Sequence, residues 1–340
     1  MSNKYLKLWE ELKKEPVESL NRNSRVLIVD GLNTFIRSYV ASPVTNENGL
    51  HVGGISGTIL SIGHAIKTVD ATRVVVVFDG KNGSKRRRDF FPEYKASRKF
   101  KIRLNRSEEL EEGEDSQKRQ LLRLVEYLEQ MPVDTVTIEG AEADDVIAYM
   151  VQEVFKEQCY IMSSDKDFLQ LINDKVQVWS PTKKKLYYAA DVLEEYGITP
   201  QNFVLHRAMI GDQSDNIPGV SGIGLKTLIK LYPSLGKEEV VTAKQLVEEA
   251  KTQTKSKKYA AIAESAEILE RNLTLMSLKD VDIPAAKKLS IIGQLDKKHR
   301  LSKLKLQAMF YQDRMSGTIR NFDVWVKETL QKLDLFLLSQ

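Results

Sequence analysis

Acidic residues stand where several apolar runs of the sequence end. Asp30 closes RVLIVD, Asp79 closes RVVVVFD, and Asp165 and Asp167 follow CYIMSS. Short continuous apolar runs are typical of strands buried on both faces of a parallel sheet. Because the carboxyl ends of parallel strands line one crevice, we expect these side chains to meet. Two further segments, EADD and GDQSDN, add the remaining acids: Glu142, Asp144, Asp145, Asp212 and Asp215.

Gathering so many carboxylates without cations is unfavourable. Two like charges 4 Å apart repel by about 4 kcal/mol at an effective dielectric constant near 20. Mg²⁺ or Mn²⁺, which prefer oxygen ligands, would remove that repulsion. Two such ions about 3.5–4 Å apart can stabilise the attacking and leaving oxygens of phosphodiester hydrolysis. Any one of these Asp residues could instead cap a helix, but that explanation fits the whole set poorly.

A basic segment, KRRRDFFPEYKASRKFKIR, lies between the second and third of these acid groups. Arg and Lys contact phosphates, and aromatic rings can stack on unpaired bases. The alternative is a solvated basic linker. The predicted nucleic-acid contacts are Arg86, Arg87, Arg88, Tyr94, Lys95 and Arg98.

The segment PGVSGIGLK resembles the turn of a helix-hairpin-helix. Gly219, Gly222 and Gly224 would let backbone N–H groups approach a phosphate, and Lys226 could reach the same phosphate. A lone glycine trio would be a weak signal, but this one directly follows GDQSDNI. Such contacts select DNA structure rather than base sequence.

The elements that must position these residues alternate between strand and helix. Helices are predicted over 53–69, 117–130 and 143–157, between the strand candidates, with a hairpin formed by VQVWSP and KKKLYYA. This alternation predicts an α/β domain with a doubly wound, mostly parallel sheet. After Tyr196 the chain reads as mostly helical.

We therefore expect four parts. They are an N-terminal extension (1–24), a nuclease domain (25–195) with an arch at about 82–120, a helical DNA-binding domain (196–325) with a helix-hairpin-helix at 207–231, and a tail (326–340).

Composition excludes several classes of protein. Cys159 is the single cysteine of the chain, which excludes an internal disulfide framework, and the four histidines show no metal-ligand spacing. No apolar run reaches the ~18–20 residues of a membrane span, and the charged N-terminus does not resemble a secretory signal. These features predict a cytoplasmic protein.

The motifs LIVDGLN, VVVFDG, RRDFFPEYKASR, GAEADDVIA, SSDKDFLQL and MIGDQSDNIPGVSGIGLKTL occur in this order over about residues 25–325. In this respect the chain resembles the 5′-nuclease superfamily of flap endonucleases and 5′-3′ exonucleases, and most of all phage replication enzymes of the phage RNase H type. The resemblance implies two Mg²⁺, with Mn²⁺ as a substitute, and a location in the host cytoplasm if a phage encodes the chain.

Carried onto matching positions, the resemblance gives the acids separate roles. Asp30, Asp79, Glu142 and Asp144 would hold the first ion, and Asp165 would lie between the two. Asp167, Asp212 and Asp215 would form the second site, some through water, with Asp145 assisting from outside.

The same resemblance assigns the other residues. Lys95 and Arg98 match a catalytic basic pair, Tyr94 a stacking residue, and Arg207 a basic residue near the scissile phosphate. It implies an arch around a single-stranded 5′ end and a K⁺ ion at the helix-hairpin-helix. Implied substrates are branched or nicked DNA with a 5′ single-stranded end, and RNA–DNA hybrids.

The C-terminal segment QKLDLF is similar to short peptides that dock on bacterial-type sliding clamps. The residues concerned are Gln331, Leu333, Leu335 and Phe336. The alternative is a C-terminal helix folded onto its own core. A single-stranded-DNA-binding protein is a further candidate partner for a replication enzyme.

Two other functions remain open at this point. A PIN-type ribonuclease would share the acidic crevice, but a helix-hairpin-helix suits duplex DNA better. A non-catalytic binder of branched DNA would not need the complete set of acids.

Overall fold

The computed structural model describes residues 21–96, 114–253, 256–279 and 281–338. Residues 97–113 of the predicted arch, which include Arg98, and residues 1–20 of the N-terminal extension lie outside these ranges.

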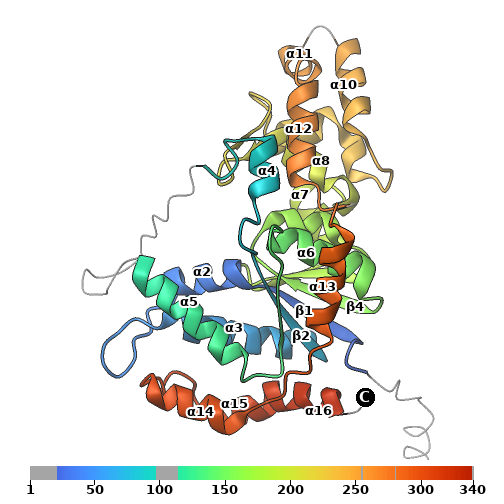
Figure 1. Cartoon of the computed structure of the whole chain (residues 1–340). Coiled ribbons are helices and arrows are strands. Elements are labelled where there is room, and N and C mark those ends of the chain that lie inside the picture. Colours follow the sequence, from blue (N-terminus) through green and yellow to red (C-terminus); the bar gives the residue numbers. More distant parts are fainter. Residues whose placement is uncertain (1–20, 97–113, 254–255, 280, 339–340) are drawn as a thin grey trace, which may run out of the picture.

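A six-stranded sheet forms the centre of the structure (Figure 1), in the order β3-β2-β1-β4-β5-β6. The first five strands run parallel, and β6 pairs antiparallel with β5, as the predicted hairpin requires. This confirms the predicted doubly wound, mostly parallel sheet. The strands are β1 (Arg25–Asp30), β2 (Arg73–Phe78), β3 (Asp134–Thr137), β4 (Gln158–Met162), β5 (Val176–Ser180) and β6 (Lys185–Tyr187).

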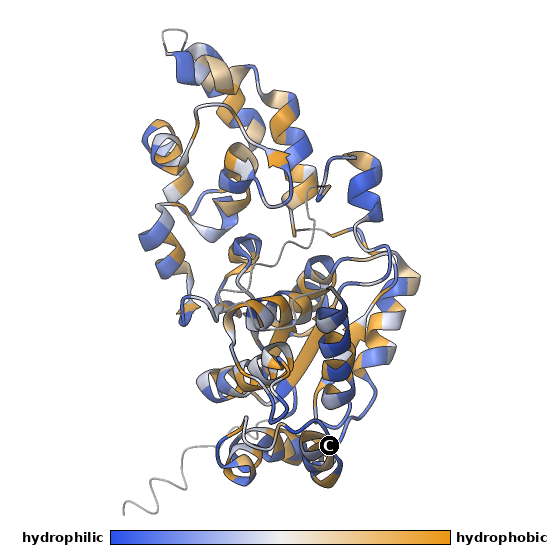
Figure 2. Ribbon diagram, turned by 90° about the vertical axis from the view of Figure 1, so that its left-hand side faces the viewer, coloured by the Kyte–Doolittle hydropathy of each residue, from blue (hydrophilic) through white to orange (hydrophobic). Residues whose placement is uncertain are grey.

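The middle residues of the central strands are apolar because both faces of the sheet are covered (Figure 2). In β1, Val26 and Ile28 point into one core, and Leu27 and Val29 point into another. This alternation follows from the period of two in a strand.

Helices cover the two faces. The core that contains Leu27 and Val29 also contains residues of α2 (Gly31–Ala41), α3 (Gly53–Val69) and α5 (Glu114–Leu128). On the other face lie α6 (Ala143–Tyr149) and α13 (Ala285–Leu295). The helix predicted over 143–157 is shorter, because its last turn is a π-helix, η1 (Met150–Val154), and Phe155 is extended.

Shorter elements connect the sheet to a helical unit above it in Figure 1. The connecting elements are α4 (Lys85–Phe90), the 3₁₀ helix η2 (Lys166–Leu171), α7 (Ala189–Tyr196) and η3 (Pro200–Asn202). The helical unit holds α8 (Phe203–Ile210), the β7 (Gly211–Asp212) and β8 (Ile217–Pro218) pair, α9 (Leu225–Leu231), η4 (Pro233–Gly236), α10 (Ala243–Thr252), α11 (Lys257–Ala263) and α12 (Ala266–Met276).

The C-terminal helices return to the opposite side of the sheet domain (Figure 1): α14 (Lys303–Gln312), α15 (Phe322–Val326), η5 (Lys327–Gln331) and α16 (Lys332–Leu338). Their apolar residues belong to the core beneath α3 and α5, and Trp325 lies directly against Gly63. We therefore propose that the helical unit ends near Leu278, well before the predicted limit of residue 325.

The predicted clamp-binding segment is part of this C-terminal layer. Leu333 is 2% exposed and belongs to the core, whereas Leu335 is 62% exposed. Docking as an extended peptide would require Leu333 to leave the core, so the structure favours the helix folded onto its own domain. Within the described ranges, no helix is long and apolar enough to cross a membrane.

A buried group of three charged residues, Asp134, Arg22 and Arg73, connects several elements at one edge of the sheet. Asp134 is fully buried and accepts hydrogen bonds from Arg22 at 2.6 Å and from Arg73 at 2.7 Å. Arg73 also donates to the carbonyl of Leu295, at the end of α13. The triad thus joins the segment before β1 to β2, β3 and α13.

Replacing Asp134 tests this anchor. Asp134→Asn should lower the free energy of unfolding by about 3–5 kcal/mol, because two buried guanidinium groups lose their counter-charge. As a control, Glu126→Ala removes a carboxylate that is 55% exposed and paired with Arg123, and should cost less than about 1 kcal/mol. Urea unfolding measures both, and equal small losses would contradict the anchoring role.

Candidate metal centre

The carboxyl ends of β1, β2 and β4 place three of the predicted acids at one edge of the sheet. The crevice lies where the strand order reverses, with β1 between β2 and β4. Asp30 is the N-cap of α2 and accepts a hydrogen bond from the backbone N–H of Asn33 at 3.2 Å. The hydroxyl of Ser163, at the end of β4, donates to Asp30 at 3.0 Å.

Backbone hydrogen bonds fix the neighbouring carboxylates. Asp79 accepts from the N–H of Ala143 at 2.9 Å, which joins the end of β2 to the start of α6. Asp165 caps η2 and accepts from the N–H of Asp167 at 2.9 Å, while its own N–H donates to Ser163. Ser163 therefore links Asp30 to Asp165.

The start of α6 carries the densest acidic group. Glu142 is the N-cap, Asp144 and Asp145 are in the first turn, and one ligand atom from each lies within 4.8 Å of the others. A group of this geometry can hold a divalent cation.

Burial and mutual repulsion raise the pKa of most of these carboxyls. Burial raises the pKa of Asp30 to about 7, aided by the charges of Asp79 and Asp165. Burial, with the charge of Asp165, likewise raises the pKa of Asp167 to about 7. Burial is also the first cause of the raised pKa of Asp165, and Asp144 and Asp215 add to it. Acids that are distant in the sequence therefore lie close enough to influence each other's charge.

Cations from other elements already partner several of the acids. Arg207 of α8 bridges Asp167, at 2.5 Å, and Asp212 of β7. Lys95 donates to Glu142 at 2.5 Å. Burial opposes the charged form of Asp144, but Arg87 and Lys95 outweigh it and lower the pKa of that carboxyl.

The three glycines of the glycine-rich turn have different surroundings. A Cβ on Gly219 would lie 2.1 Å from the carbonyl oxygen of Ile210, so the backbones there are too close for a side chain. Gly222 has φ +74°, which favours glycine. Gly224 has open space beside it, and Lys226 in α9 is exposed. This turn precedes α9, as the helix-hairpin-helix prediction expects.

A family profile described as "5'-3' exonuclease, N-terminal resolvase-like domain" matches residues 25–197. The chain belongs to this 5′-3′ exonuclease family.

Relatives in sequence agree. The 5′-3′ exonuclease of Buchnera aphidicola subsp. Acyrthosiphon pisum (strain APS) is 32% identical over 214 residues, 62% of this chain and 70% of that protein. The thermostable DNA polymerase I of Thermus filiformis is 36% identical over 217 residues, 63% of this chain but 24% of the polymerase. The chain thus spans about a quarter of the polymerase's length.

Solved structures agree as well. The bacteriophage T5 D15 protein co-crystallized with metal ions has a TM-score of 0.59 at 25% identity, over 85% of this chain and 98% of that one. Flap endonuclease-1 from Methanococcus jannaschii has a TM-score of 0.52 at 17% identity over 94% of each chain, which shows a common fold.

Two predicted nucleic-acid contacts of this 5′-3′ exonuclease family member have unexpected surroundings. Tyr94 is 2% exposed, and its hydroxyl donates to Glu142 at 3.1 Å, so its ring is not available to stack on a base in this conformation. Arg87 is 4% exposed, whereas its neighbours Arg86 and Arg88 are exposed. Three consecutive arginines carry no local signal that could have predicted this difference.

Sequence reasoning also missed Ser163 and Asn33. Ser163 is 1% exposed and bonds to two strand ends, and the Asn33 side chain accepts from the N–H of Ser164 at 3.1 Å. The polar pair Ser163–Ser164 between a buried strand and Asp165 is the signal that could have indicated Ser163.

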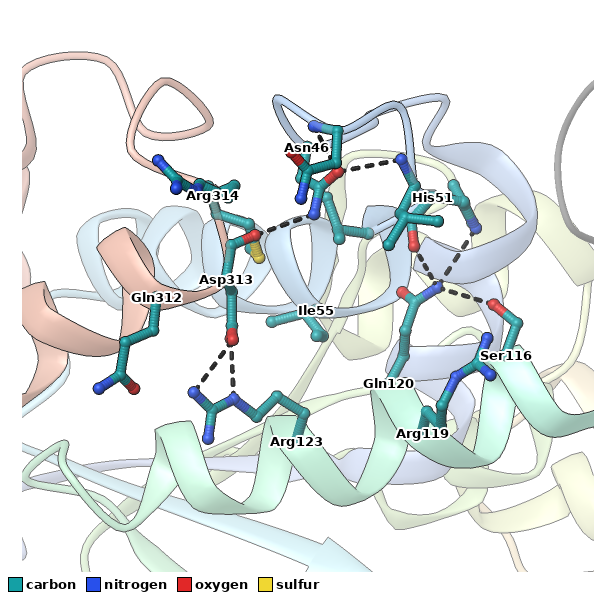
Figure 3. Close-up of a pocket in the computed structure, with 14 residues that line it drawn as sticks. Asn46, His51, Ile55, Ser116, Arg119, Gln120, Arg123, Gln312, Asp313 and Arg314 are labelled. Atoms are coloured by element: carbon teal, nitrogen blue, oxygen red, sulfur yellow. Dashed lines mark hydrogen bonds and ion pairs between the residues drawn. The ribbon is translucent and has the colours of Figure 1, made fainter.

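A separate cavity of about 480 Å³ lies between α5, the loop before α3 and the turn after α14 (Figure 3). Across it, Arg123 and Tyr127 donate to Asp313, both at 2.8 Å, which joins α5 to the C-terminal layer. None of the predicted acids lines this cavity. We therefore place the chemistry in the crevice.

The raised pKa values give metal binding a pH dependence. Below pH 7, Asp30 and Asp167 hold protons that must leave before they can bind a metal ion. Mn²⁺ affinity at each of the two ion sites should therefore fall by up to about tenfold per pH unit below 7, for one displaced proton at each site, and level off above it. Calorimetric titration with Mn²⁺ at several pH values measures this, and Asp30→Asn should give a shallower slope. A flat affinity profile through pH 7 would contradict it.

Proposed function

We propose that this chain is a structure-specific 5′-nuclease, with 5′-3′ exonuclease and flap endonuclease activity that depends on two Mg²⁺ or Mn²⁺. The main support is the meeting of acids from three strand ends, the start of α6 and the β7 turn in one crevice. Membership of the 5′-3′ exonuclease family supports the same activity. The bacteriophage T5 5′-exonuclease, a structural neighbour at 25% identity, binds divalent zinc.

The donor set fits two hard cations, because it consists of carboxylate oxygens. For the first ion we propose Asp30, Asp79, Glu142 and Asp144, with Asp165 between the two ions. For the second we propose Asp167, Asp212 and Asp215, with Asp145 outside the ligand set. When bound, such ions lower the pKa of a water nucleophile and neutralise charge on the scissile phosphate.

The chain's own cations would stabilise the charge that builds on that phosphate. Lys95 is one of the predicted pair, and its ammonium donates a hydrogen bond to Glu142 in the crevice. The Lys95 side chain is 18% exposed, so a phosphate entering the crevice can take over its bond. Arg98 is proposed as its partner from the sequence alone.

The helical unit would hold duplex DNA through its backbone phosphates. Gly222, Gly224 and Lys226 lie on the exposed part of the turn, and a K⁺ ion would suit the turn's backbone carbonyls. The substrates we propose are 5′ flaps, nicks and RNA primers paired to DNA, removed during replication. A T5 D15 flap endonuclease variant has been crystallised with DNA and metal ions, which supports this class of substrate.

Replacement of two central acids tests the chemistry. Asp165→Asn with Asp167→Asn should reduce cleavage of a labelled 5′ flap by about a thousandfold or more, because losing an ion's stabilisation removes several kcal/mol from the transition state. Binding of the flap should change little. The control is Asp174→Asn, an exposed Asp outside the crevice. Unchanged cleavage by the double variant would reject the catalytic assignment.

Replacement of one glycine tests the duplex contact. Gly224→Ala should fold normally, since its φ is −112° and nothing lies within 4 Å of the added Cβ. The methyl group would hold a phosphate away from the backbone N–H groups, so nicked-duplex affinity should fall several-fold. Gly293→Ala, with equally open space on α13, is the matched control. Equal affinities, measured by fluorescence anisotropy, would count against this contact.

A further inference from the structure

Three consecutive arginines in α4 have different surroundings. The side chain of Arg86 is 53% exposed, and that of Arg87 is 5% exposed. Arg88 is exposed as well. Arg86 and Arg88 therefore remain candidates for phosphate contacts, whereas Arg87 is inaccessible to DNA.

Arg87 instead forms a fork between three elements. Its two terminal nitrogens donate to the two carboxylate oxygens of Asp145 at 2.9 and 2.7 Å, and one of them also donates to Glu142. Its Nε donates to the carbonyl of Leu275 in α12 at 2.9 Å. The side chain thus joins α4 to the acid group of α6 and to the helical unit.

Glu142 has two oxygens with different cationic partners. Arg87 bonds to Oε2, and Lys95 bonds to Oε1. Arg87 bonds to Asp145, Glu142 and the carbonyl of Leu275, and moving its buried guanidinium away would leave these partners and its own charge uncompensated. The Lys95 ammonium contacts only Glu142 and the ring of Tyr94 among the described residues and is partly exposed, so it is the partner that can leave.

We propose that Arg87 is a positioning residue for the metal centre: it holds Glu142 through Oε2 so that Oε1 is presented to an ion once Lys95 has left. The inference rests on the proposed metal site. It assigns opposite roles to two cations on one carboxylate, since Arg87 orients the ligand and Lys95 competes with the ion. Groups that orient metal ligands in this way are typically worth about 10–100-fold in metal affinity.

A charge-conserving substitution separates orientation from charge. Arg87→Lys keeps the positive charge but loses the planar fork that bonds two oxygens of Asp145. Mn²⁺ affinity, measured by the electron paramagnetic resonance of free Mn²⁺ in titrations of the full chain without DNA, should fall by about tenfold or more. The same exchange at the exposed neighbour, Arg88→Lys, should leave it unchanged, and Lys95→Met should leave it equal or raise it.

Thermal melts establish that each variant is folded at the titration temperature. If Arg87→Lys does not fold, the second variant is Asp145→Asn, in which the new side chain has the size of the old one. Asp145→Asn removes the carboxylate that accepts two hydrogen bonds from Arg87, so Arg87 is held less firmly and Mn²⁺ binding should also weaken. Unchanged or tighter binding in the folded Arg87→Lys or Asp145→Asn protein would overturn the inference, since Arg87 would then be only a counter-charge. If the wild-type protein binds no Mn²⁺, the proposed function fails together with the inference. If the wild-type protein binds Mn²⁺ and the folded variants bind it equally well, only the inference fails.

Discussion

Repulsion between buried carboxylates is the constraint on which the rest of the structure depends. Parallel strands bring Asp30, Asp79 and Asp165 to one edge of the sheet, and the repulsion among them has to be offset by positive charge. Part of that charge comes from the chain itself, through Arg87, Lys95 and Arg207. In the account proposed here, divalent ions supply the remainder.

The origin of these cations relates the metal centre to DNA binding. Arg87 and Lys95 come from the base of the predicted arch, and Arg207 comes from α8 in the helical unit. Tyr94 packs with Val204 and Ile217 of that unit. The segments expected to hold nucleic acid therefore meet the acids directly. A phosphate that entered the crevice would change the partners of the same side chains that an ion would change.

Much of this arrangement could be predicted from the sequence because its signals are local. An apolar run that ends in Asp indicates both a buried parallel strand and the position of its last side chain. The turn that contains Gly219 and Gly222 is likewise set by backbone geometry over a few residues. Which residue of a repetitive segment is buried depends on residues far away in the chain. The segment KRRRDF does not reveal that only the middle one of its three arginines is buried. The return of α14–α16 to the sheet, with Trp325 against Gly63, depends on long-range packing that no short motif encodes.

The most direct test of the central claim is a crystal of the protein soaked in Mn²⁺, with anomalous scattering used to locate the ions. Two peaks about 3.5–4 Å apart are expected, one among Asp30, Asp79, Glu142 and Asp144, and the other beside Asp167, Asp212 and Asp215. Lys95 should have moved away from Glu142, with Arg87 still in place. A crevice without anomalous peaks, its acids still bound to Lys95 and Arg207, would contradict the account.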